Sequence, residues 1–314
     1  MPNLLEVKGL KKYFKTQKGF LHAVDDVSFS IRQGCTLGVV GESGCGKSTL
    51  GRTVLHLIER SSGEIRFEDR DISSVSGEQL KALRKDMQMI FQDPYSSLNP
   101  RMPIHEIVSE PLVIYDMYKS RAELYDKVRE LMDAVGLSKK FAYLYPHELD
   151  GGRRQRVGIA RALALGPKFI VCDEPVSALD VSIQAQILNL MQDLQEERNL
   201  TYMFITHNLS VVRHISDEII VMYLGNMVEY CETEELFLNP LHPYTKALLS
   251  AIPSVDIDVK RTREVLKGEL SSPINPKPGC RFAARCSRAQ ALCNERNPEL
   301  TEIDMRHFVA CHYV

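Results

Sequence analysis

A glycine-rich run at residues 41–49 carries the strongest chemical signal in the sequence. Its letters, GESGCGKST, fit the pattern G-x-x-x-x-G-K followed by Ser or Thr, between an apolar strand pattern (36–41) and a helical one. Glycines let backbone N–H groups curl around phosphate, and the helix start adds the positive end of its dipole. Lys47 would bridge the β- and γ-phosphates, and Ser48 would hold Mg²⁺. The run predicts a nucleoside triphosphate site formed by Gly41, Ser43, Gly44, Cys45, Gly46, Lys47, Ser48 and Thr49.

An acidic pair ends a second apolar run, at residues 168–174 (KFIVCDE). Ligands of parallel sheets bind at the carboxyl ends of the strands, where these carboxylates lie. Asp173 is placed to organise Mg²⁺ through its water shell, and Glu174 to polarise the water that attacks the γ-phosphate. In isolation, an acidic pair after a strand is as often a solvent-exposed strand end as a functional site. Because this pair follows a phosphate-binding loop in the chain, it indicates hydrolysis of the bound triphosphate.

The elements that position these residues alternate along the chain. Short alternating runs near the start (LLEVKGL, HAVDDVSFSI, GEIRFED) predict strands, and so does TYMFITH at 201–207. Between about residues 94 and 166 the apolar spacing is helical. We therefore expect an α/β fold with a β-rich opening, a mainly parallel sheet covered on both faces, and an inserted helical subdomain at about 94–166.

Composition excludes several other classes of protein. The 314 residues are 44% hydrophobic with a net charge of −2, so there is apolar material for a core and no basic field for nucleic acid. No apolar run reaches the roughly 18 residues that span a bilayer, and the first residues are not those of a signal peptide. We expect a cytosolic chain with no nucleic-acid partner.

Further motifs follow in a fixed order: Gln92 in IFQDP, the run LDGGR at 149–153, the Asp173–Glu174 pair, SALD at 177–180, and His207. Their order and spacing resemble those of the ATP-binding subunits of ABC transporters, over residues 1 to about 235. The resemblance implies that ATP is the nucleotide and that the core is a RecA-type P-loop fold with an antiparallel β subdomain.

The resemblance also implies a role for each motif. Gln92 would touch the metal, with Ser48 and Asp173, and couple the site to membrane subunits, while His207 would contact the γ-phosphate. The segment Asp150–Gly151–Gly152 lies in the place of the family's LSGGQ signature, which caps the γ-phosphate bound to the opposite subunit. Phe14, or its neighbour Tyr13, falls where the family stacks an aromatic ring on adenine.

Other runs narrow the resemblance to one branch. FQDPYSSLNPR, YPHEL, MYLGNMVEY, HPYT at 242–245 and the cysteine-rich ending are similar to the dipeptide and oligopeptide importers, most closely to the second of their two ATPase subunits. This implies an ABC ATPase domain (1–235) and a C-terminal extension (236–314). It also implies a peripheral protein on the cytoplasmic face of the membrane, which powers peptide import. Its partners would be a sister ATPase or a second copy, two permease subunits and, indirectly, a peptide-binding protein.

The signature departs from the family pattern. Asp150 stands in place of serine and Arg153 in place of glutamine. A carboxylate there would face phosphate, and the repulsion at about 4 Å costs about 1–4 kcal/mol at effective dielectric constants of about 80–20. Arg153 offers compensation by pairing with Asp150 or with phosphate.

Four cysteines crowd the C-terminal extension with spacing C-x5-C-x6-C-x17-C: Cys280, Cys286, Cys293 and Cys311. Paired C-x-x-C knuckles, the usual zinc signature, are absent. Iron–sulfur clusters take four cysteines at varied spacings, and some members of the importer branch carry a [4Fe–4S] cluster at this tail. We favour the cluster over free thiols, and free thiols over zinc. His307 and His312 could substitute for a cysteine ligand, but we expect them at the surface instead.

Two other functions compete with transport. One is a soluble ABC ATPase of DNA repair or translation, which typically has a long coiled-coil insertion or two tandem halves; neither is present in 314 residues. The other is a largely non-catalytic partner subunit marked by the altered signature. Intact Lys47, Asp173, Glu174 and His207 argue against it.

Overall fold

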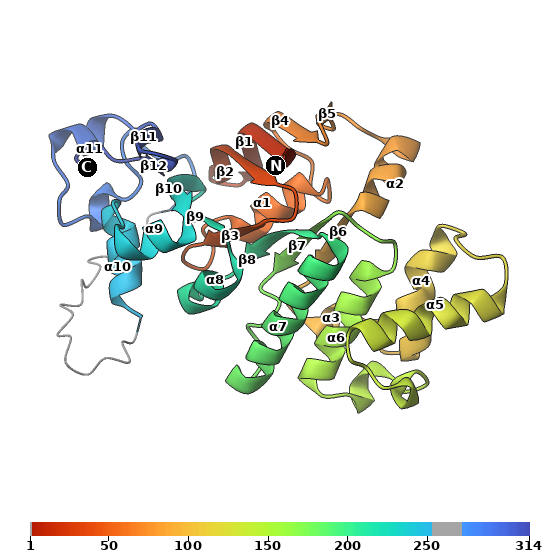
Figure 1. Ribbon diagram of the computed structural model, residues 1–314. Helices are drawn as coiled ribbons and strands as arrows, with labels where there is room; N and C mark the ends of the chain where they lie inside the picture. Colours follow the sequence, from red (N-terminus) through yellow and green to blue (C-terminus); the bar gives the residue numbers. More distant parts are fainter. Residues whose placement is uncertain (1, 253–271) are drawn as a thin grey trace. The chain divides into compact units, whose positions relative to one another are not determined.

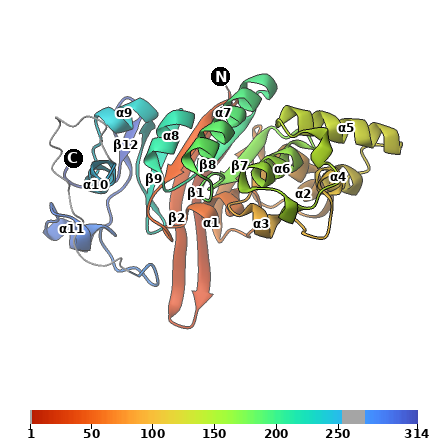
Figure 2. The same ribbon diagram turned by 90° about the horizontal axis from the view of Figure 1, so that it is seen from below.

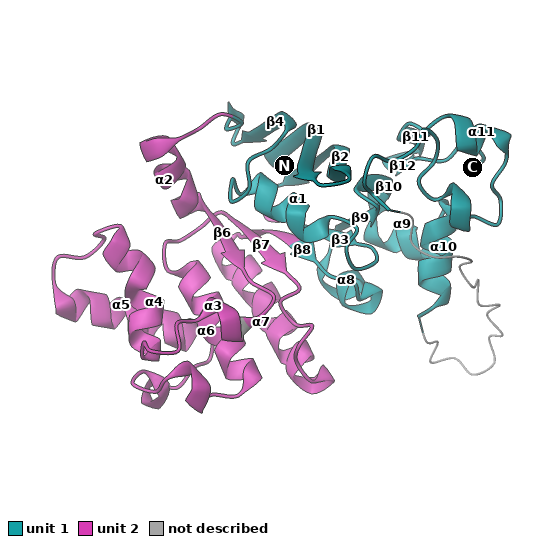
Figure 3. Cartoon of the chain, turned by 180° about the vertical axis from the view of Figure 1, so that it is seen from behind, with its two compact units in different colours: residues 1–32, 36–73, 204–314 teal, residues 33–35, 74–203 magenta. Residues whose placement is uncertain are grey.

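A computed structural model describes residues 2–252 and 272–314. The chain divides into two compact units (Figure 3). Unit 1 comprises residues 1–32, 36–73 and 204–314, and unit 2 comprises residues 33–35 and 74–203. Part of the predicted extension, residues 253–271, lies outside the described residues.

Unit 1 begins with an antiparallel sheet of strand order β2-β1-β4-β5. A long hairpin (Figure 2) supplies two of its strands. The bounds are β1 (Asn3–Thr16), β2 (Gly19–Arg32), β4 (Ser62–Phe67) and β5 (Arg70–Asp71). Apolar side chains at alternate positions, such as Leu5 and Val7 in β1, are buried, as period-two patterning requires. The predicted antiparallel β-rich opening is confirmed.

A second run of strands in unit 1 has the order β11-β12-β10-β9-β3. Its members are β3 (Thr36–Val40), β9 (Glu218–Tyr223), β10 (Asn226–Glu232), β11 (Thr301–Asp304) and β12 (His307–Val309). Strand β3 is buried along its whole length and pairs in parallel with β9, which explains why its residues after Thr36 carry no polar side chain. The other pairs in this run are antiparallel, so this part of the sheet is mixed, whereas a mainly parallel sheet was expected.

The helices of unit 1 are mostly short. They are α1 (Lys47–Val54), α8 (Leu209–Ile215), α9 (Thr233–Leu238), α10 (Pro243–Ser250), the 3-10 turn η3 (Ala283–Arg285) and α11 (Ala291–Glu295). Helix α1 contacts β2, and α8 contacts β3.

Unit 2 holds the parallel pair β6 (Met87–Ile90) and β7 (Phe169–Asp173) with most of the long helices (Figure 1). Strand β8 (Thr201–Ile205) has residues in both units. The helical elements are α2 (Gly77–Asp86), α3 (Pro94–Ser97), α4 (Ile104–Ile114), α5 (Arg121–Ala134), η1 (Lys139–Phe141), η2 (Pro146–Glu148), α6 (Gly151–Leu163) and α7 (Val181–Arg198). The helical stretch predicted at about 94–166 is thus occupied by α3 to α6. In the described ranges, no helix is both long and apolar enough to cross a bilayer.

A buried carboxylate ties the C-terminal residues of unit 1 to β10. Glu229 is fully buried and accepts hydrogen bonds from the backbone N–H groups of Leu241 (2.7 Å) and His242 (3.1 Å). Its Oε1 also lies 2.8 Å from Nε2 of His307, and this hydrogen bond raises the pKa of that imidazole. His307 is therefore a buried partner of Glu229, and its expected surface position is wrong.

His242 is buried in the neutral form. Its Nδ1 accepts a hydrogen bond from the backbone N–H of Tyr244 (3.1 Å) and so caps helix α10. Burial lowers the pKa of His242 to about 4. The unfolded chain takes up this proton at its ordinary pKa of about 6.5, so the residue costs stability as the pH falls below that value.

We predict that His242→Asn makes the chain less sensitive to mild acid. Asparagine keeps a capping oxygen but has no proton to gain. Between about pH 7.5 and pH 5 the wild type should lose about 2 kcal/mol of unfolding free energy that the variant keeps. Urea unfolding of both chains at the two pH values measures this difference. An equal loss in both would show that His242 is not the group responsible.

Candidate active site

The phosphate-binding loop joins β3 to α1 in unit 1, as the sequence predicts. Gly46 caps α1 with a left-handed backbone (φ 107°), and a Cβ at this position would overlap the carbonyl oxygen of Ala23 in β2. Only glycine combines this conformation with so close a backbone approach. The loop is therefore held in shape by the strand beside it.

The loop is also tied to the turn between β9 and β10. The N–H of Gly225 donates to the carbonyl of Cys45 (2.8 Å), and its own carbonyl accepts from the N–H of Asp25 (2.9 Å). A Cβ on Gly225 would lie 2.5 Å from the carbonyl oxygen of His22. Three segments far apart in sequence thus meet backbone to backbone at two glycines.

Lys47 lies within the loop that it would serve. Its side chain is buried, and Nζ donates to the carbonyls of Gly41 (2.8 Å) and Glu42 (3.0 Å). Neighbouring Cys45 is buried too, and burial raises the pKa of its thiol. A buried ammonium that contacts neutral carbonyls is available to a stronger, anionic acceptor.

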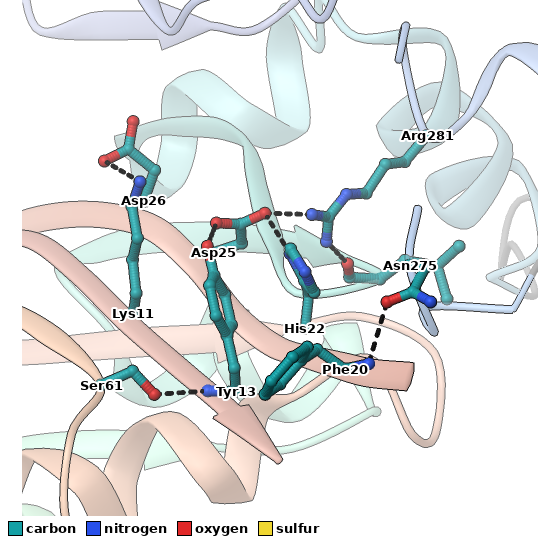
Figure 4. Close-up of polar contacts among 10 residues, drawn as sticks. Lys11, Tyr13, Phe20, His22, Asp25, Asp26, Ser61, Asn275 and Arg281 are labelled. Atoms are coloured by element: carbon teal, nitrogen blue, oxygen red, sulfur yellow. Dashed lines mark hydrogen bonds and ion pairs between the residues drawn. The ribbon is translucent and has the colours of Figure 1, made fainter. Parts of the chain in front are cut away.

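The two aromatic candidates for base stacking occupy adjacent positions in β1. The Tyr13 ring stacks on His22 (centroids 3.9 Å apart), and its hydroxyl hydrogen-bonds the Asp25 carboxylate (Figure 4). Burial and this hydrogen bond raise the pKa of Tyr13. Phe14 is half-buried, with Nζ of Lys12 4.7 Å from the ring centroid. Successive side chains of a strand point to opposite faces, so only one of Tyr13 and Phe14 can face the adenine base of a bound nucleotide.

Two predicted residues touch each other in unit 2. Nε2 of Gln92 donates to Oε2 of Glu174 (3.1 Å). Asp173, the last residue of β7, is fully buried, and Glu174 has a left-handed backbone (φ 47°). A glutamate rarely adopts this conformation, and such strain is common at active sites. The structure therefore places the expected base in direct contact with the expected metal-contacting amide.

The signature segment begins helix α6. Asp150 is its N-cap: Oδ1 accepts from the N–H of Arg153 (2.8 Å), and Oδ2 pairs with the Arg153 guanidinium (2.7 Å). The pairing offered by the sequence is present. A Cβ on Gly152 would lie 2.7 Å from Cγ2 of Ile183, so this glycine allows α6 to approach α7 closely.

His207 follows β8 in unit 1 and is exposed. The next residue, Asn208, caps α8 by accepting from the N–H of Ser210 (3.0 Å). This helix start carries the short polar side chain that an N-cap requires, which sequence inspection could have recognised.

The four C-terminal cysteines line one pocket, with His242, Phe282 and His312 among its other walls. Burial, reinforced by the neighbouring cysteines, raises the pKa of the Cys280 thiol to about 11. None of the four forms a disulfide. Among the described residues, no group of three or more His, Cys, Asp or Glu side chains is arranged to hold a metal ion. The iron–sulfur cluster stays a prediction.

Comparison with known proteins decides the family. An ABC transporter model matches residues 24–177, and an oligopeptide/dipeptide transporter C-terminal region model matches residues 228–293. The oligopeptide transport ATP-binding protein AppF of Bacillus subtilis is 56% identical, with 98% of this chain and 97% of AppF covered. The OppF protein of Salmonella typhimurium is 50% identical, with 98% and 95% covered. This chain belongs to the oligopeptide-transporter family of ABC ATP-binding subunits.

Solved structures agree with this ABC family assignment. The ATP-binding cassette MJ0796, determined as a dimer bound to ADP and phosphate, gives a TM-score of 0.67 at 29% identity. The alignment covers 73% of this chain and 98% of that one. The cbiO1 protein of Clostridium perfringens gives a TM-score of 0.68 at 27% identity, covering 76% and 92%. The ABC ATPase fold predicted from the motifs is confirmed.

Sequence reasoning missed the residues that hold the loop of this ABC subunit from outside. Arg285 binds the Glu42 carboxylate through both terminal nitrogens (2.7 and 3.0 Å), and the Tyr244 hydroxyl accepts from the Glu42 N–H (2.9 Å). The sequence gives no pairing signal across 243 and 202 residues.

We predict that Asp150→Ala destabilises the ABC subunit whereas Asp150→Ser does not. Serine keeps an oxygen for the Arg153 N–H, and loss of an N-cap costs about 1 kcal/mol. The side-chain pair with Arg153 is exposed and contributes little. Urea unfolding of the two variants checks this. Equal destabilisation by both would mean that the ion pair, not the cap, stabilises the helix.

Proposed function

We propose that this chain is the ATP-hydrolysing subunit that powers import of dipeptides or oligopeptides through a membrane permease. The observation that carries the proposal is the match over nearly the whole chain to oligopeptide transport ATP-binding proteins, C-terminal region included. The domain boundaries belong to the same proposal: an ABC ATPase domain at 1–235 and an extension at 236–314.

The residues of the site would divide the work as follows. Backbone N–H groups of the loop and Lys47 bind the triphosphate, and His207 contacts the γ-phosphate. Phe14 or Tyr13 stacks on adenine. Glu174 accepts the proton of the attacking water, and its contact with Gln92 fixes the position of its carboxylate.

Ser48, Asp173 and Gln92 would hold Mg²⁺. They offer hydroxyl, carboxylate and amide oxygens, the donors that this cation prefers. Bound there, Mg²⁺ neutralises charge that develops on the phosphates.

The active form would be a dimer with a sister ATPase or a second copy. The signature Asp150–Gly151–Gly152 of one subunit then completes the nucleotide site of the other. Two permease subunits would bind this pair at the cytoplasmic face of the membrane, and an extracytoplasmic protein would deliver the peptide. A soluble ABC ATPase or a non-catalytic partner subunit are the alternatives. Co-purification with candidate permease subunits followed by a turnover assay separates the three.

We predict that Glu174→Gln retains ATP binding and loses most turnover. Glutamine keeps an oxygen for Gln92 but cannot take a proton, and a positioned general base contributes about 10²–10⁴-fold. Steady-state hydrolysis by the purified transporter complex is the measurement. Glu197→Gln, an exposed position on α7, is the matched control. Wild-type turnover in Glu174→Gln would remove this residue from the catalytic role.

We also propose that the cysteine pocket binds an iron–sulfur cluster. What supports this is that Cys280, Cys286, Cys293 and Cys311 surround one pocket. Thiolates bind iron, and loop-rich segments of this kind derive folding energy from metal binding.

Anaerobically purified protein should then be brown and contain iron and acid-labile sulfide. Cys286→Ser should bleach the colour and loosen residues 272–314, whereas Cys35→Ser, outside the pocket, should change neither. Metal analysis and visible absorbance measure the first effect, and limited proteolysis measures the second. A colourless protein with about one zinc per chain would replace the cluster by zinc, and a metal-free protein would leave free thiols.

A further inference from the structure

Glu42, the second residue of the phosphate-binding loop, is held at three points. Its N–H donates to Tyr244, its carbonyl accepts from Lys47, and its carboxylate forms the two-pronged pair with Arg285. Tyr244 and Arg285 come from beyond residue 235, so the C-terminal extension contributes two of the three.

The pair with Arg285 neutralises the negative charge of Glu42 within the phosphate-binding loop. A free carboxylate among groups that bind a triphosphate would repel the ligand. The Arg285 side chain is 9% exposed and Glu42 24% exposed, so water screens this pair less than a surface pair. A two-pronged arginine–carboxylate pair also fixes direction, and so keeps the Glu42 charge neutralised in one place.

An aromatic cluster anchors the segment that carries Arg285. The rings of Tyr223, Tyr244 and Phe282 are all buried, and their centroids are 4.8–5.4 Å apart. Phe282 directly precedes the turn η3, which ends at Arg285. The Arg285 side chain therefore extends from a backbone segment that is anchored in the core.

A second arginine of the same segment holds the β1–β2 hairpin. Arg281 pairs with Asp25 (Figure 4). It also donates to the carbonyl of Leu224. The same carboxylate accepts from the Tyr13 hydroxyl and lies 3.0 Å from Nδ1 of His22. Arg281 is thus connected through Asp25 to Tyr13, a candidate for base stacking, as Arg285 is connected to the phosphate-binding loop through Glu42.

We propose that the segment Cys280–Cys286 is a positioning element for nucleotide binding. Arg285, with Tyr244, sets the conformation of the phosphate-binding loop through Glu42. Arg281 sets the Tyr13 ring through Asp25, and this second half rests on the proposed role of Tyr13 or Phe14 in base stacking. Each arginine would act through a carboxylate, Asp25 or Glu42, so both are positioning residues.

Equilibrium binding of ATP and of inorganic tripolyphosphate to the full chain tests the two halves separately. Arg285→Ala should weaken both ligands about tenfold, because the loop that binds phosphate is no longer held. Arg281→Ala should weaken ATP but leave tripolyphosphate unchanged. Arg213→Ala is the matched control: it removes another two-pronged arginine–glutamate pair, with Glu234, and should change neither affinity.

A double-mutant cycle with Glu42→Gln distinguishes positioning from a general loss of structure. If Arg285 acts through the Glu42 carboxylate, Arg285→Ala should cost less in the Glu42→Gln background than in the wild type. In the assembled transporter, Arg285→Ala should raise KM for ATP and leave kcat within about twofold. If Arg285→Ala does not fold, Arg285→Lys, which keeps the charge but not the fork, should give an intermediate loss.

Three results would overturn the proposal. An unchanged affinity for tripolyphosphate in Arg285→Ala would refute the proposed role of Arg285 at the phosphate-binding loop. An equal loss of affinity from Arg285→Ala in the wild-type and Glu42→Gln backgrounds would refute it as well. An unchanged affinity for ATP in Arg281→Ala would refute the proposed role of Arg281 in positioning Tyr13. None of these measurements involves peptide transport, so a failure here is distinct from a failure of the proposed function.

Discussion

The close backbone contact of three segments at Gly46 and Gly225 is the constraint on which the candidate site depends. Strand β2, the phosphate-binding loop and the β9–β10 turn approach so closely that a Cβ at either glycine would collide with a carbonyl oxygen. Hydrogen bonds through Gly225 then join Cys45 to Asp25. Main-chain packing therefore fixes the end of the loop at Cys45 and Gly46, while Glu42 near its start is held by side chains of the extension.

The sequence was most informative where local pattern and local structure coincide. The glycine-rich loop between a strand and a helix, the acidic pair at the end of β7 and the helical stretch from Pro94 onward were all predicted, because each depends on neighbouring residues. The Asp150–Arg153 pair was also accessible, since the residues are one helical turn apart.

Long-range contacts were not predictable in this way. A mainly parallel sheet was expected because strands and helices alternate along the chain, and that pattern did not reveal the antiparallel pairing of β10 with β9 and β12. His307 was expected at the surface because its partner Glu229 lies 78 residues away. Glu42 gave no sign of Arg285 for the same reason: nothing in a single sequence marks two complementary charges as neighbours.

The hold of the extension on Glu42 bears on how such subunits can be recombined. A chain cut or exchanged at residue 235 would keep every motif that defines an ATPase and yet leave a glutamate of the phosphate loop without its arginine. Glu42 and the C-terminal segment therefore belong to one structural unit, although the sequence suggests a domain followed by a separate tail. In a chimaera of two relatives, the loop and the extension would need to come from the same parent.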